Sequence, residues 1–245
     1  MPEQHTVRSY DEELERLNKI IVEMGGLAES QIAAAVDAVV QRDSDLAARV
    51  IESDLKVDQL ERDLDVQAVR LLALRQPVGR DLREIVAALK IGSDLERICD
   101  YAANVAKRSI VLAQAPPIEP VHALPRMAHL ALLLVKDVID AYVERDADKA
   151  ILVWARDEEL DEMYSSLFRE FLTYMMEDPR NIGIYTHLMF MAKNVERIGD
   201  HATNIAEDLY FMVHGTPLTQ ARPKGDKSSL ELIAPPRPSS EAVAP

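Results

Sequence analysis

The residues of this sequence best suited to chemistry are pairs of acidic residues spaced four positions apart. Two of these pairs lie in closely similar stretches, LERICDYAANVAKR (residues 95–108) and VERIGDHATNIAED (residues 195–208). A helix places positions i and i+4 on one face, so each Glu would project beside an Asp, with an Asn one turn further on. Carboxylate oxygens gathered in this way are ligands for divalent or trivalent metal ions. The polar and charged residues that recur in both stretches are Glu96, Arg97, Asp100 and Asn104 in the first and Glu196, Arg197, Asp200 and Asn204 in the second.

Each half of the chain carries a second acidic pair upstream of the first, and these pairs also occupy matching positions. If neighbouring helices run antiparallel, each half brings four carboxylates together. The candidate metal ligands are Asp54, Asp58, Glu96 and Asp100 in the first half and Asp157, Asp161, Glu196 and Asp200 in the second. The alternative is that duplicated helices carry duplicated solvated faces, because a chain with 42 acidic residues contains such pairs by chance. Spacing alone leaves both explanations open.

The elements that must position these carboxylates form an internal repeat. Residues 24–60 align with residues 127–163 without a gap, and the second copy is then three residues shorter at its second bend, where a loop absorbs the change. Apolar residues recur at helical spacing almost throughout, broken by Asp, Pro and Gly at regular points. We predict helices over residues 10–41, 44–75, 80–113, 122–145, 147–177 and 181–213. The predicted fold is all-α, with two tandem, symmetry-related three-helix bundles.

The pattern divides the chain into four parts. We expect a first three-helix repeat over residues 1–114, a Pro-rich linker over 115–121, and a second repeat over 122–214. The tail, residues 215–245, contains six prolines and too few large apolar residues to fold, so we expect it to be disordered. Within the repeats, Cys99 stands where the second copy has Gly199, which indicates a close helix contact. His201 follows Asp200 directly and is expected at the surface, not among the ligands.

Composition narrows the class of protein. A net charge of −14 argues against a nucleic-acid partner, because phosphates require many Lys and Arg residues. The single cysteine excludes an internal disulfide and suits a reducing cytosol. The polar N-terminus carries no secretory signal, and no apolar run is long enough to cross a bilayer. We expect a soluble, cytoplasmic protein that reaches a membrane only through a partner.

Motifs for catalysis are missing from the sequence. There is no Walker loop, Gly-rich dinucleotide turn or Gly-x-Ser-x-Gly elbow. The only Glu-x-x-His match of the di-iron type, residues 119–122, falls in the Pro-rich linker. We therefore predict a non-enzymatic protein, with a metal-dependent phosphatase or oxidase that uses the carboxylates as the alternative.

The chain resembles the PhoU family of bacterial phosphate-signalling regulators in three features: its two copies of the motif, its internal repeat and its length. The resemblance implies a homodimer of paired three-helix bundles without enzymatic activity. It implies a role in restraining the phosphate-starvation response, by linking the ATPase subunit of the phosphate ABC transporter to the phosphate-sensing histidine kinase. Some members of the family carry iron or zinc clusters at E(D)xxxD motifs, which fall here on the eight carboxylates named above. Manganese and magnesium are the other candidate ions.

Overall fold

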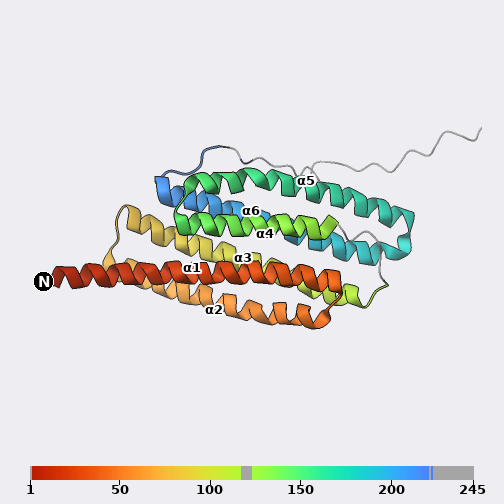
Figure 1. Ribbon diagram of the computed structural model, residues 1–245, viewed down its shortest axis with the longest axis horizontal. Helices are drawn as coiled ribbons and strands as arrows, with labels where there is room; N and C mark the ends of the chain where they lie inside the picture. Colours follow the sequence, from red (N-terminus) through yellow and green to blue (C-terminus); the bar gives the residue numbers. More distant parts are fainter. Residues whose placement is uncertain (1, 117–122, 221, 223–245) are drawn as a thin grey trace, which may run out of the picture.

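The computed structural model describes residues 2–116, 123–220 and 222, and within these ranges it contains helices and no strands (Figure 1). The all-α prediction is confirmed. The helices are α1 (Pro2–Gln41), α2 (Ser44–Arg75), α3 (Arg80–Ala113), α4 (Ala123–Glu144), α5 (Ala147–Glu177) and α6 (Ile182–His214), with a short 3-10 helix η1 (Pro179–Asn181) before α6. The predicted disordered tail lies outside the described residues, except for residues 215–220 and 222, and so does the linker from residue 117.

Matching corners start the second helix of each repeat. Arg42 and Arg145 both adopt the left-handed conformation, with φ of 56° and 55°. The next residue in each repeat caps the following helix: Asp43 Oδ1 accepts from two backbone N–H groups at 2.9 Å, and Asp146 Oδ1 does the same at 3.0 Å. Such a cap satisfies N–H groups that lack a partner inside the helix. The repeat seen in the sequence is therefore a repeat of structure.

The start of α1 differs from its prediction. The helix begins at Pro2, whereas the apolar pattern placed its start at residue 10. Extending an existing helix is far less costly than nucleating one, and Pro is well tolerated in a first turn. Apolar periodicity marks only the part of a helix that packs on a core, so it does not detect such an extension.

The six helices form two layers of three that meet through α3 and α6 (Figure 1). α1, α2 and α3 pack together, as do α4, α5 and α6, and the layers touch where α3 lies on α6 and α1 lies on α4. α2 and α5 contact only helices of their own repeat, apart from η1, and lie at opposite edges of the molecule. Many buried residues of α3 are alanines, which let the helices approach closely. No helix within the described ranges has a stretch long and apolar enough to cross a bilayer.

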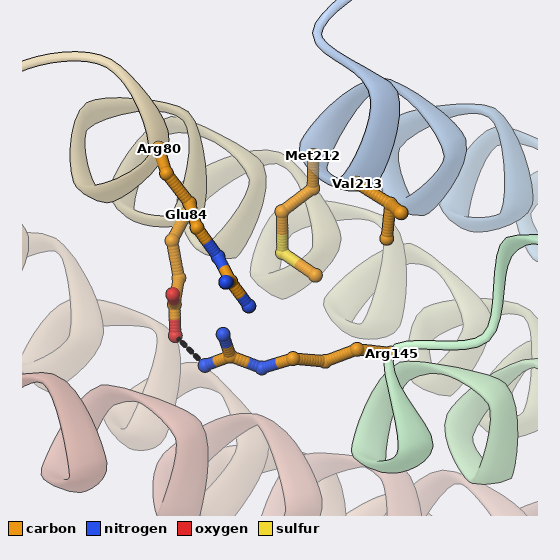
Figure 2. Close-up of a pocket in the computed structure, with 5 residues that line it drawn as sticks. All are labelled: Arg80, Glu84, Arg145, Met212 and Val213. Atoms are coloured by element: carbon orange, nitrogen blue, oxygen red, sulfur yellow. Dashed lines mark hydrogen bonds and ion pairs between the residues drawn. The ribbon is translucent and has the colours of Figure 1, made fainter.

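A partly buried polar network ties the two repeats together beside a cavity of about 180 Å³ (Figure 2). Glu84 of α3 accepts from Arg145, which reaches across from the α4–α5 corner, and from Asn18 Nδ2 at 3.0 Å. Asn18 Oδ1 in turn accepts from the Tyr142 hydroxyl at 2.6 Å. The network joins α1 and α3 of the first repeat to α4 and the following corner of the second.

This network breaks the symmetry between the two corners. Arg42 Nη2 donates to the carbonyl of Ala113 at 2.9 Å and so caps the end of α3. Arg145 occupies the equivalent corner but turns to Glu84, while Arg83 Nε donates to the carbonyl of Met212 at the end of α6, at 3.4 Å. One corner arginine closes its own repeat, and the other joins the two repeats.

Glu84→Ala should therefore destabilise the protein by about 1–2 kcal/mol, because the half-buried Asn18 and the partly exposed Arg145 both lose their acceptor. Glu84→Gln keeps one acceptor oxygen and should cost less. Urea unfolding measures the difference in the free energy of unfolding, provided that the variants have equal m-values. Glu15→Ala removes an exposed partner of Lys19 and serves as the control, with no measurable change expected. Equal stability of Glu84→Ala and the parent would contradict a structural role for the network.

Candidate cation sites in two carboxylate clusters

The predicted ligands gather in two places, one in each repeat. The first cluster, Asp54 and Asp58 of α2 with Glu96 and Asp100 of α3, lies where α2 packs on α3. The second cluster, Asp157 and Asp161 of α5 with Glu196 and Asp200 of α6, lies where α5 packs on α6. Within each cluster the carboxylates are close enough to repel one another across the helix pair. The structure thus brings together the residues that the repeat spacing grouped.

The first cluster is partly open to solvent and carries unbalanced negative charge. Burial raises the pKa of Asp54 to about 6, and repulsion from Asp100 and Asp58 adds to this shift. Burial also raises the pKa of Glu96 to about 7, helped by Asp100 and opposed by Arg97. These shifts mean that full negative charge on Asp54 and Glu96 is costly unless a cation is present.

Glu61 extends the first cluster and was missed by the sequence analysis. Its pKa is raised by burial, then by repulsion from Asp65 and Asp58, and its charge acts on Glu96 in turn. The available signal was its position one turn beyond Asp58 on α2. The second copy has Tyr164 at the corresponding place, so the repeat does not mark Glu61 as a candidate ligand.

The arginine and asparagine of the repeated motif have different surroundings in the two copies. Arg97 Nη1 lies 3.1 Å from Asp100 Oδ2, and its Nε lies 3.6 Å from Glu96 Oε2. Arg197 instead lies over the ring of Tyr101 on α3, 5.7 Å from its centroid. The first motif arginine therefore offsets part of the charge of its own cluster, and the second lies at the contact between the repeats.

A second contact across α3 and α6 corrects the expectation for His201. Its Nδ1 lies 2.6 Å from Asp94 Oδ1, and its ring packs 5.5 Å from that of Tyr101. Asn204 Nδ2 donates to the same Asp94 oxygen at 3.3 Å, whereas Asn104 is half-buried on α3. His201 is thus a half-buried interface residue and not a surface residue. It points away from the cluster, as its neighbouring position on the helix requires.

The second cluster is more deeply buried than the first. Asp157, Asp161 and Glu196 are all buried, with Asp157 only 1% exposed. Burial raises the pKa of Asp157 to about 6 and that of Glu196 to about 7. Lys193 Nζ donates to Glu196 Oε1 at 2.7 Å. Asp157 Oδ1 and Glu196 Oε2 are buried without a hydrogen-bond partner within the described part of the chain.

Arg222 adds a cation to the second cluster that sequence reasoning assigned no role. Its Nη2 pairs with Asp157 Oδ2 and lies 2.7 Å from Asp200 Oδ1, so it bridges α5 and α6. The side chain is 16% exposed. No periodic pattern marks this residue, because it lies beyond the last helix and pairs with a carboxylate 65 positions away.

The donor chemistry of both clusters fits hard or borderline metal ions, since every donor is a carboxylate oxygen. The buried atoms without partners, Asp157 Oδ1 and Glu196 Oε2, are the observation that best matches an ion-binding role. The positions of the side chains, unlike their chemistry, do not match a metal site: across the described ranges, no three His, Cys, Asp or Glu residues are placed to hold a metal ion. Lys193 and Arg222 now provide the positive charge of the second cluster, so metal binding there would require these side chains to move. In the first cluster Arg97 contacts only the carboxylates of α3, Glu96 and Asp100.

Comparisons with known proteins identify relatives across nearly the whole chain. A family model described as the PhoU domain matches residues 21–109 and 124–209, so each match contains one carboxylate cluster. A Caulobacter vibrioides protein (strain NA1000 / CB15N), named phosphate-specific transport system accessory protein PhoU homolog, is 51% identical over 224 residues, covering 91% of this chain and 97% of the relative.

Solved structures agree with this sequence match. The crystal structure of PhoU from Pseudomonas aeruginosa gives a TM-score of 0.82 at 40% identity, covering 84% of this chain and all (100%) of that one. The phosphate transport system regulatory protein PhoU from Streptococcus pneumoniae gives a TM-score of 0.80 at 29% identity, covering 86% of this chain and 100% of that one. With two family matches that coincide with its two structural repeats, this chain belongs to the PhoU family.

Proposed function

We propose that this protein is a non-enzymatic accessory of a phosphate-specific transport system, which restrains phosphate uptake and the phosphate-starvation response when phosphate is plentiful. The observation that carries the proposal is the 51% identity, over almost the full length of both chains, to a protein named as such an accessory. The Streptococcus pneumoniae relative is named a regulatory protein of the phosphate transport system, which supports a regulatory role.

The finer proposal is that the protein works as a cytoplasmic adaptor, as a homodimer, between the transporter's ATPase subunit and the phosphate-sensing histidine kinase. The arrangement of helices suits this role. α2 and α5 lie at opposite edges, and each contacts helices of its own repeat and none of the other. Two similar outer surfaces on one packed core would allow two partners to bind at the same time, so that the state of one could influence the other.

We further propose that the carboxylate clusters bind divalent or trivalent metal ions, with iron, zinc, manganese and magnesium as candidates. Asp54, Asp58, Glu96 and Asp100 would hold one site and Asp157, Asp161, Glu196 and Asp200 the other. A bound ion would neutralise carboxylates whose pKa values are raised by burial, and would join α2 to α3 or α5 to α6.

A metal-dependent phosphatase or oxidase is the competing function. No specific observation favours it, because the motif residues His201, Asn204 and Arg197 face the contact between repeats and not the carboxylates. Metal-dependent turnover of a phosphoester, or oxygen consumption, by the purified protein would favour the enzyme over the adaptor.

Deleting the gene should switch on phosphate-uptake genes in phosphate-rich medium, to about the level of starved cells. The kinase would no longer be held in its non-signalling state. A transcriptional reporter measures the effect, and the parent gene supplied in trans should reverse it. Silent uptake genes in the deletion strain would refute the regulatory role.

The partners can be tested separately from the regulation. The tagged protein, captured from detergent-treated, phosphate-replete cells, should bring down the transporter ATPase and the histidine kinase. If the phosphate-uptake genes are regulated but neither partner is captured, the accessory role would stand and the adaptor role would be contradicted.

A further inference from the structure

We propose that Arg222 is a built-in cation that closes the second carboxylate cluster, so that the two clusters differ in their access to metal ions. The first cluster is open, and the second is closed until the segment that carries Arg222 is released. This inference rests on the proposed metal binding, and it assigns a function to a residue outside the two family matches, which end at residue 209.

The geometry of Arg222 is that of an ion held between two helices. One nitrogen, Nη2, contacts Asp157 of α5 and Asp200 of α6. These two carboxylates belong to the same set that would coordinate a metal, and they come from both sides of the helix pair. A guanidinium at this position and a metal ion compete for the same carboxylate charge and the same space between α5 and α6, so binding of one disfavours the other.

Among the residues that the structure describes, no arginine bridges the two helices of the first cluster. Arg97 contacts Glu96 and Asp100, which are its neighbours on α3, and its side chain is 56% exposed. Neither Asp54 nor Asp58 of α2 forms an ion pair with a Lys or Arg of the described residues. Since this arginine stays on one helix at the solvent edge, it leaves the carboxylates of α2 free to accept an incoming cation.

The contact of Arg222 is well placed but incompletely satisfied. Its Nε and the Asp157 Oδ1 are both buried without a hydrogen-bond partner in the described part of the chain. Buried polar atoms left unpaired are costly, and that cost offsets part of the gain from the ion pair. A cation of higher charge, which could recruit more of the cluster's oxygens, can therefore compete with the guanidinium.

The chain connection favours rebinding of Arg222. α6 ends at a left-handed Gly215, with φ of 76°, which directs the chain out of the helix. Arg222 follows only a few residues later, so it remains at high local concentration near the cluster. Arginine also keeps its charge at any physiological pH. The closure is thus always available and is opened only by competition for the carboxylates.

Arg222→Gln tests the proposal, with Mn²⁺ as the probe. Free Mn²⁺ measured by electron paramagnetic resonance should show uptake by the parent at the first cluster, and about twofold greater uptake by Arg222→Gln. The double substitution Glu96→Gln and Asp100→Asn should abolish Mn²⁺ uptake when it is made in the parent. When it is made together with Arg222→Gln, Mn²⁺ uptake at the second cluster should remain. In EDTA, Arg222→Gln should melt at a lower temperature than the parent, because Asp157 loses its counter-charge, and Mn²⁺ should recover the loss.

Arg237→Gln is the matched control, since it removes the same charge from the same tail, and it should behave as the parent in both measurements. If Arg222→Gln folds poorly, Arg222→Lys keeps the charge without the planar fork and should show intermediate Mn²⁺ uptake. Equal uptake by the parent and Arg222→Gln would overturn the closure, and so would uptake by neither. An unchanged melting temperature in EDTA would overturn the ion pair itself. None of these results bears on the accessory role, which is measured in cells.

Discussion

Gly199→Leu should lower the free energy of unfolding by about 3 kcal/mol or more, because α5 and α6 leave no space for a side chain there. A Cβ at Gly199 would lie 2.3 Å from Leu160 Cδ2 and 2.6 Å from Asp157 Oδ1. Leucine adds three more carbons, so it would force the helices apart and move an aspartate of the second cluster. Gly92→Leu should have a similar effect in the first repeat, where a Cβ would lie 2.2 Å from Leu64 Cδ2. Urea unfolding of purified variants measures both.

Gly26→Leu is the control for this pair of substitutions. Gly26 also lies within a helix, α1, but a Cβ there would meet no atom within 4 Å. Leucine has a higher helix propensity than glycine, so this variant should gain up to about 0.5–1 kcal/mol. If all three variants were equally stable, α5 and α6 would not be in close contact at Gly199.

The metal-free protein should be more stable at pH 5.5 than at pH 7.5. Asp54 and Asp157 have pKa values raised to about 6, and Glu96 and Glu196 to about 7, mainly through burial. In the unfolded chain these groups titrate near pH 4. Between pH 4 and 7 the folded state therefore binds more protons than the unfolded state, and stability falls as the pH rises through this window. Thermal melts in EDTA across this pH range measure the effect.

Glu96→Gln tests whether the carboxylates of the first cluster cause that pH dependence of stability. Glutamine cannot ionise, so the variant should melt above the parent at pH 7.5 and show a flatter profile. Glu52→Gln changes an exposed glutamate of the same repeat, on α2, and should leave the profile as it is in the parent. A profile that rises towards pH 7.5 in EDTA would show that burial of the clusters does not control stability in this range.

The sequence predicted the features of this fold that have local causes. The starts of α2 and α5 follow from Asp43 and Asp146, whose side chains cap the helices that they precede. The grouping of carboxylates in each half followed from spacing on one helix face and from the repeat. Those signals lie within a few turns of chain, where rules of periodicity and capping apply.

Features that depend on packing between distant segments could not be predicted in this way. Arg42 and Arg145 are equivalent in the repeat, yet one caps a helix end and the other binds Glu84, because only the second corner faces the other repeat. His201 has its partner, Asp94, on a helix more than one hundred positions earlier. Arg222 lies in a segment without periodicity, and the buried charge that attracts it is visible only in three dimensions.

Because α3 packs on α6, each three-helix repeat depends on the other repeat to bury part of its surface. Each of these helices buries one face within its own repeat and another against the other repeat. A single copy on its own would expose that second face to water and leave Glu84 and Asp94 without the partners that the other copy supplies. We therefore expect the two repeats to unfold together as one cooperative unit. A chain with one repeat alone would need another surface, such as a second copy of itself, to cover that face.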